Sequence, residues 1–87
     1  MKIQIPDIMR PVIGGVPTVE VKAKTVREAL AELAVKYPAI KPRLYEQEGK
    51  LYGYIDFFVN NQDIGSNLDY PLKETDELFI LVTIYGG

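Results

Sequence analysis

A single helix-length apolar stripe constrains the fold of this chain of 87 residues more than any other feature. Between residues 25 and 37, apolar residues recur at the three- and four-residue spacing of one helix face. Thr25 and Glu28 have the spacing of a capping box, and Pro38 ends the helix at or before Tyr37. A lone helix of this kind must pack its apolar face against one face of a sheet. The stripe consists of Val26, Ala29, Leu30, Leu33, Ala34 and Tyr37.

Alternating polar and apolar residues predict the strands of that sheet. Before the helix, segments 2–5 and 16–22 are expected to form an antiparallel hairpin, with a loop that turns at Gly14-Gly15. After the helix, we expect a short helical turn that carries Ile40 and Leu44.

Two further strands follow, at 54–59 and from Leu78 onward, with a short extended segment near Ile64 between them. The last strand fits best in the centre of the sheet, beside the first strand and parallel to it. The whole chain, 1–87, is therefore expected to be one α+β domain. It would contain a mixed sheet of four or five strands with one main helix on one face, which is the β-grasp arrangement.

The composition argues against catalysis by the chain itself. There is no cysteine and no histidine, so thiolate zinc sites, cysteine nucleophiles and the commonest general base are excluded. The net charge is −2, with 10 basic and 12 acidic residues well mixed, so we expect no nucleic-acid partner. No signal peptide or membrane span is evident, and a cytoplasmic protein is expected. We expect a protein that is acted upon, with no metal and no bound cofactor.

The last segment ends on two glycines, Gly86 and Gly87. Glycine packs no side chain and loses much entropy on ordering, so the tail is expected to leave the sheet as a flexible arm. Such an arm could thread a narrow channel that a Cβ atom would block. This is what a second protein needs if it is to act on the terminal carboxylate.

Four short motifs accompany the predicted fold: IPDIMRP at 5–11 followed by Gly14-Gly15, FVNNQDI at 58–64, the acidic pair Asp76-Glu77 before the last strand, and Gly86-Gly87. With these motifs, the chain resembles the ubiquitin-like sulfur carriers of the MoaD/ThiS type. These include the small subunit of molybdopterin synthase, the thiamin-pathway carrier and, most similar, the cysteine-biosynthesis carrier.

The resemblance implies a function as a protein co-substrate. In this family an E1-like adenylyltransferase of the MoeB/ThiF type uses ATP to adenylate the terminal carboxylate. The adenylate becomes a thiocarboxylate, which donates sulfur to an acceptor enzyme. The resemblance implies that Gly87 carries the sulfur and that Gly86 gives the arm clearance. A protein modifier joined to lysines through Gly87, and a plain interaction module, are the alternatives.

One helix can cover only one face of the sheet, so apolar residues on the other face need a partner. Alternation places Leu78, Ile80 and the set Ile55, Phe57 and Val59 in the core. It leaves Phe58, Phe79 and Leu81 on the uncovered face, beside the tail. We expect these three to dock the activating and acceptor enzymes. Loop residues, or a second copy in a weak homodimer, are the alternative cover. Asp76 and Glu77 are interpreted as solvated turn residues, and Gly14-Gly15 as a turn because no P-loop Lys-Ser/Thr follows.

Overall fold

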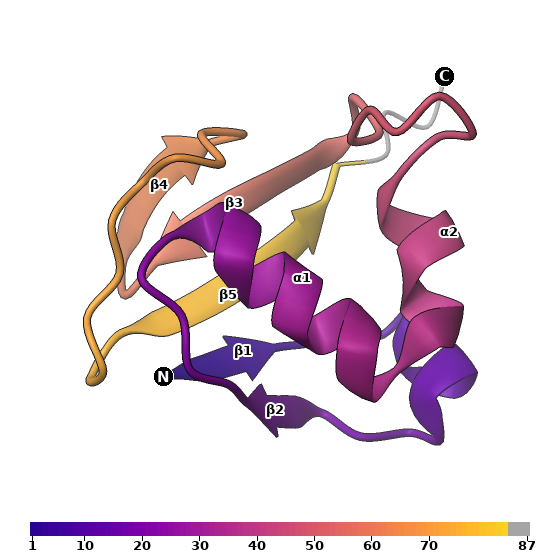
Figure 1. Cartoon of the computed structure of the whole chain (residues 1–87), viewed down its shortest axis with the longest axis horizontal. Helices are drawn as coiled ribbons and strands as arrows, with labels where there is room; N and C mark the ends of the chain where they lie inside the picture. Colours follow the sequence, from indigo (N-terminus) through magenta and orange to yellow (C-terminus); the bar gives the residue numbers. More distant parts are fainter. Residues whose placement is uncertain (84–87) are drawn as a thin grey trace.

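The main helix, α1 (Val26–Lys36), lies across one face of a five-stranded sheet (Figure 1). This computed structural model describes residues 1–83. The strands are β1 (Lys2–Gln4), β2 (Thr18–Glu20), β3 (Ile55–Val59), β4 (Gln62–Gly65) and β5 (Glu77–Val82). Three short helical turns complete the described chain: η1 (Arg10–Ile13), η2 (Pro38–Ile40) and α2 (Lys41–Leu44).

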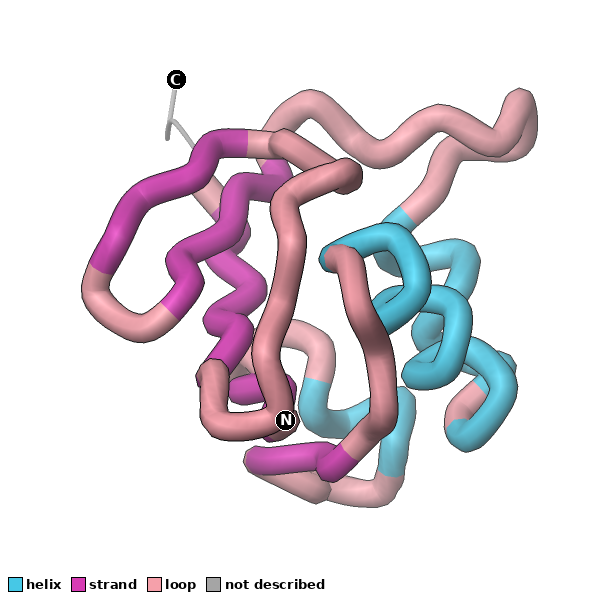
Figure 2. The backbone as a smooth tube through the Cα atoms, turned by 60° about the vertical axis from the view of Figure 1, so that its left-hand side comes forward, coloured by secondary structure: helices cyan, strands magenta, loops and turns pink. Residues whose placement is uncertain are grey.

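The strand order is β2-β1-β5-β3-β4. β5 is the central strand, parallel to β1 and antiparallel to β3, while β1–β2 and β3–β4 are antiparallel pairs. In Figure 2 the helices lie together on one side of the strands. The predicted β-grasp topology is therefore confirmed, including the central last strand.

The core lies between α1 and the inner face of the sheet. Leu78 and Ile80 of β5 are buried, as are the three alternate residues of β3 that were assigned to the core. From α1, the first four residues of the apolar stripe are buried, while Ala34 and Tyr37 pack at its margin. The predicted pair Ile40 and Leu44 closes one end of the core with no exposed surface.

The helix cap differs from the predicted capping box in one hydrogen bond. Thr25 Oγ1 accepts from the Glu28 N–H at 3.2 Å, as expected. The Glu28 carboxylate, however, accepts from the Lys24 N–H at 3.1 Å instead of returning to Thr25. Thr25 forms an isolated bridge with Pro71, and the Leu72 N–H donates to the Lys24 carbonyl at 2.8 Å. Because the chain is extended where it enters the helix, the Lys24 N–H is the donor that faces the Glu28 carboxylate.

The segment predicted as a loop after the first strand contains the helical turn η1. Pro11 fits the first turn of a helix because its missing N–H needs no partner there. Ile13 is buried and holds the turn against the core. Gly14 and Gly15 then adopt positive φ angles of 76° and 82°, so the predicted turn at the glycine pair is confirmed.

The acidic turn before β5 is a hydrogen-bonded structure, and the carboxylate of Asp76, which was interpreted as solvated, also holds the turn together. Asp76 accepts from the Lys73 N–H at 2.8 Å and from the Asn60 side-chain amide at 3.0 Å. Asn60 in turn accepts from the Glu77 N–H at 3.1 Å, and its own N–H donates to the Glu77 carbonyl at 2.8 Å. The hydrogen bonds to Asp76, first that from Lys73 and then that from Asn60, lower the pKa of its carboxyl group.

We predict that Asp76→Ala lowers the free energy of unfolding at neutral pH by about 1 kcal/mol, because two hydrogen bonds to a partly solvated carboxylate are lost. A lowered pKa means that the folded state favours the ionised form. This contribution is therefore present above the ordinary carboxyl pKa of about 4 and is lost as the pH falls through the lower folded value. Denaturant unfolding at a series of pH values measures it.

Glu74→Ala is the matched control, because Glu74 is an exposed carboxylate in the same turn. The stability difference between Asp76→Ala and the wild type should shrink at acid pH. The Glu74→Ala variant should track the wild type at every pH. Equal behaviour of the two variants would contradict a clamping role for Asp76.

Candidate functional site

The outer face of the sheet carries the three residues predicted to dock partners. The β3–β5 register places Phe58 directly opposite Phe79, and Asp56 directly opposite Leu81. The three apolar side chains are each half-buried, less exposed than an open patch would be, because they pack among sheet neighbours. The register brings Phe58, Phe79 and Leu81 together as one surface, which we call the outer apolar patch.

Polar and acidic side chains border the outer apolar patch. Gln4 of β1 lies opposite Phe79, and Asp63 of β4 lies opposite Phe58. Gln4 donates to the Glu77 carboxylate at 2.9 Å and accepts from the Thr18 hydroxyl at 2.9 Å, which links β2, β1 and β5. With Asp56 beside Leu81, three carboxylates adjoin the patch. A complementary surface would be apolar at its centre and basic at its edge.

The last described residue, Thr83, is fixed to the start of β3. Its backbone N–H donates to the Tyr54 carbonyl at 2.7 Å, and its hydroxyl donates to the same oxygen at 2.9 Å. Tyr54 stacks on Tyr52, with ring centroids 5.0 Å apart and planes 10° apart. Tyr54 is 41% exposed and lies next to Thr83. No sequence signal indicates that its carbonyl accepts two hydrogen bonds.

The predicted sulfur-attachment residue Gly87 and the clearance residue Gly86 lie outside the described residues. Their roles remain predictions.

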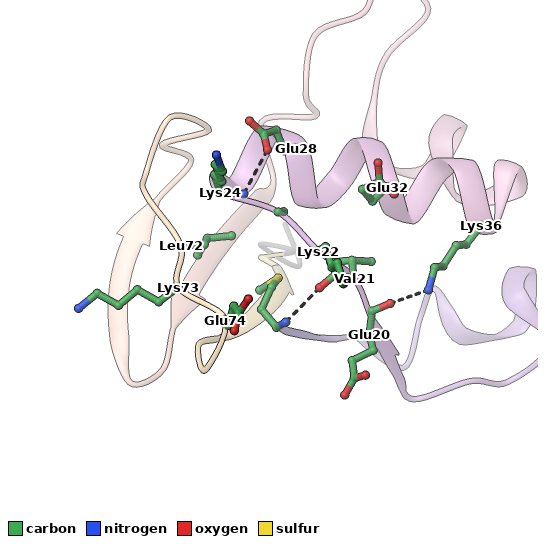
Figure 3. A pocket seen from close by; sticks show the side chains of 12 residues that line it. Glu20, Val21, Lys22, Lys24, Glu28, Glu32, Lys36, Leu72, Lys73 and Glu74 are labelled. Carbon is green, nitrogen blue, oxygen red and sulfur yellow. Dashed lines mark hydrogen bonds between the residues drawn. The ribbon is translucent and has the colours of Figure 1, made fainter.

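An open groove lies on the other side of the molecule, between the start of α1, the chain after β2 and residues 72–74 (Figure 3). Its charged side chains are of both signs, and two of its amines serve the fold. The amino group of Met1 donates to the Val21 carbonyl at 3.0 Å, and Lys36 Nζ donates to the Glu20 carbonyl at 2.7 Å. These two amines therefore hold the backbone around the groove.

Few titratable groups among the described residues have a clearly shifted pKa. Burial raises the pKa of Tyr45, and the nearby positive charge of Arg27 only partly opposes this. Tyr45 is therefore a neutral phenol at physiological pH. Across residues 1–83 no cluster of acidic side chains is arranged to hold a metal ion. None of the helices in this part of the chain is long and apolar enough to cross a membrane.

Comparisons with known proteins agree with this architecture. The curated sulfur carrier protein CysO of Mycobacterium tuberculosis is 29% identical over 89 aligned positions, covering 98% of this chain and 96% of the relative. A chain in the crystal structure of the Amycolatopsis orientalis BexX/CysO complex is 35% identical, with a TM-score of 0.85 and coverage of 99% and 98% of the two chains.

The small archaeal modifier protein 1 of Methanosarcina acetivorans is 29% identical, with a TM-score of 0.83 and coverage of 99% of this chain and 94% of that one. The curated relative is named as a sulfur carrier protein and not as an enzyme, which agrees with the expectation that this chain is not an enzyme. Residues 3–87 match the model of the ThiS family, and the chain belongs to that family.

Proposed function

We propose that this protein is a sulfur carrier whose Gly87 carboxylate is activated by a partner enzyme and converted to a thiocarboxylate. The observation that carries the proposal is the family match, which extends through the glycine pair to residue 87. The cysteine-biosynthesis type is favoured because the curated sulfur carrier CysO aligns over nearly its full length. We place this activity in the cytoplasm.

The chemistry follows from the poor reactivity of a carboxylate toward nucleophiles. A carboxylate oxygen of Gly87 attacks the α-phosphorus of ATP, held by an E1-like adenylyltransferase, and pyrophosphate leaves. The acyl-adenylate then has a good leaving group. Hydrosulfide attacks its carbonyl carbon, the bond to AMP breaks, and the thiocarboxylate remains. No step requires a thiol or a general base on the carrier, so the lack of cysteine and histidine is compatible with this function.

A protein modifier is the second candidate, because the chain is 29% identical to a structure named as a small archaeal modifier protein. In that case the ε-amine of a target lysine would attack the same activated carbonyl. An isopeptide bond would form in place of the thiocarboxylate.

The outer apolar patch is the proposed docking surface for the activating and acceptor enzymes. Phe79 and Leu81 lie on β5, which leads toward the tail, and Phe58 lies opposite Phe79 on the antiparallel strand β3. The helix α1 covers the opposite face of the sheet. The adjoining carboxylates favour enzymes with basic residues around an apolar contact.

The tryptic peptide 74–87 contains Gly87, so its mass tests whether a thiocarboxylate forms there. After incubation with the adenylyltransferase, ATP and sulfide, we expect this peptide to gain the mass of one oxygen-to-sulfur exchange. Oxidation of methionine adds nearly the same mass, but both methionines, Met1 and Met9, lie outside this peptide. A thiol-alkylating reagent should label only the treated chain, because the protein has no cysteine.

Deletion of Gly87 is the control and should abolish both the mass gain and the label. An isopeptide from Gly87 to a lysine would support the modifier. If an adenylyltransferase that activates another carrier leaves peptide 74–87 unchanged, the proposed function is wrong.

We predict that Phe79→Lys raises the KM of the adenylyltransferase for the carrier by about tenfold or more, because a charge replaces a central apolar contact. Val35→Lys is the matched control. Val35 is 74% exposed on the helical side of the molecule and should tolerate the same change. Steady-state pyrophosphate release measures both variants, and circular dichroism checks that they fold. An unchanged KM for folded Phe79→Lys would exclude the patch as the dock.

A further inference from the structure

The ladder between β3 and β5 extends one pair beyond the strands themselves. The last pair within the strands joins Ile55 to Val82, and the next pair in this register joins Tyr54 to Thr83. Thr83 makes that pair with two donors, its N–H and its hydroxyl, on the single Tyr54 carbonyl oxygen. The end of β5 is therefore fixed by backbone and side chain together.

These two hydrogen bonds matter because the end of β5 has a strand on one side only. Pairing between β1 and β5 covers Lys2–Gln4 and Glu77–Phe79. The next residue, Ile5, continues the pairing of β1 with β2, since its N–H donates to the Pro17 carbonyl at 2.9 Å. From Ile80 to Val82, the residues of β5 have paired residues on β3 only, and the contact of Thr83 with Tyr54 is the last described attachment of this end.

The accepting carbonyl is itself held in place. Tyr54 stacks on Tyr52, whose N–H donates to the Leu44 carbonyl at 2.9 Å. The Ile55 N–H also donates back to the Tyr52 carbonyl at 3.1 Å. Leu44 is fully buried, so the turn that presents the Tyr54 carbonyl is attached to the core.

We infer that Thr83 is a positioning residue for activation of the C-terminal glycine, with the Tyr54 carbonyl as its anchor. This inference rests on the proposed function. Residues 84–87 follow Thr83, and four extended residues span at most about 14 Å. The reactive carboxylate must reach the partner's nucleotide from this fixed point while the outer apolar patch is docked.

Thr83 and the outer apolar patch are expected to affect different kinetic constants. Weaker attachment of Thr83 to the Tyr54 carbonyl leaves the docking surface intact, so the affinity of the enzyme for the carrier is unchanged. It spreads the carboxylate over more positions, and a smaller fraction of docked complexes holds it in line with the nucleotide. The cost therefore falls on kcat, whereas damage to the patch falls on KM.

Thr83→Val is the test, because valine keeps the β-branched shape and the N–H but removes the hydroxyl donor. We expect kcat for adenylation to fall about threefold to tenfold, as for the loss of one hydrogen bond, with KM for the carrier unchanged. Thr83→Ser retains the hydroxyl and should restore kcat to near the wild-type value. Amide hydrogen exchange at position 83 should be faster in Thr83→Val than in Thr83→Ser, with the same melting temperature for both.

The outcomes distinguish this inference from the proposed function. If the wild type is adenylated and Thr83→Val has the wild-type kcat, the positioning role is wrong while the carrier function stands. A rise in KM without a change in kcat would also overturn it and would assign Thr83 to docking. If the wild type is not adenylated by an enzyme that is active on another carrier, both proposals fail.

Discussion

The pairing of β5 with a strand on each side is the interaction on which the rest of the molecule depends. Its parallel pairing with β1 and antiparallel pairing with β3 join the N-terminal hairpin to the C-terminal half. The same register decides which side chains face α1. Leu78 and Ile80 are buried in the core, whereas Phe79 and Leu81 lie on the outer face. A shift of one residue would exchange these sets, so core packing also fixes the outer apolar patch.

In the proposed function the chain contributes position, and its partners supply the chemistry. Two amines of the groove beside α1 donate to backbone carbonyls, and the side chain with the raised pKa, Tyr45, is a neutral phenol. Two polar side chains within residues 1–83, those of Asp76 and Thr83, instead form hydrogen bonds that hold the backbone. Asp76 clamps the turn that starts β5, and Thr83 is held at its end. Both ends of the strand that leads to the glycines are thus fixed by side-chain hydrogen bonds.

Periodicity predicted the parts of this structure that depend on burial. The helix stripe, the inward residues of β3 and β5 and the central last strand were all predicted, because a lone helix on a sheet leaves few arrangements. Periodicity could not predict contacts that depend on where distant turns meet. The clamp between Asn60 and Asp76 joins residues 16 apart, and the Thr83–Tyr54 contact joins residues 29 apart. The helical turn at Arg10–Ile13 was missed because four residues are too few to show a period.

The two candidate functions make the same demands on the carrier until the final bond forms. Both need a docking surface, an arm with a fixed starting point and an activated glycine carboxylate. They differ only in the attacking atom, which is sulfur for a thiocarboxylate and a lysine nitrogen for an isopeptide. That atom belongs to another molecule. The fold is therefore expected to be shared by carriers and modifiers. Consistent with this, a chain of the BexX/CysO complex and a small archaeal modifier match the structure almost equally well, with TM-scores of 0.85 and 0.83. Under the proposed docking role of the outer apolar patch, the two functions differ in which enzyme recognises this patch, because that choice decides which nucleophile meets the activated glycine.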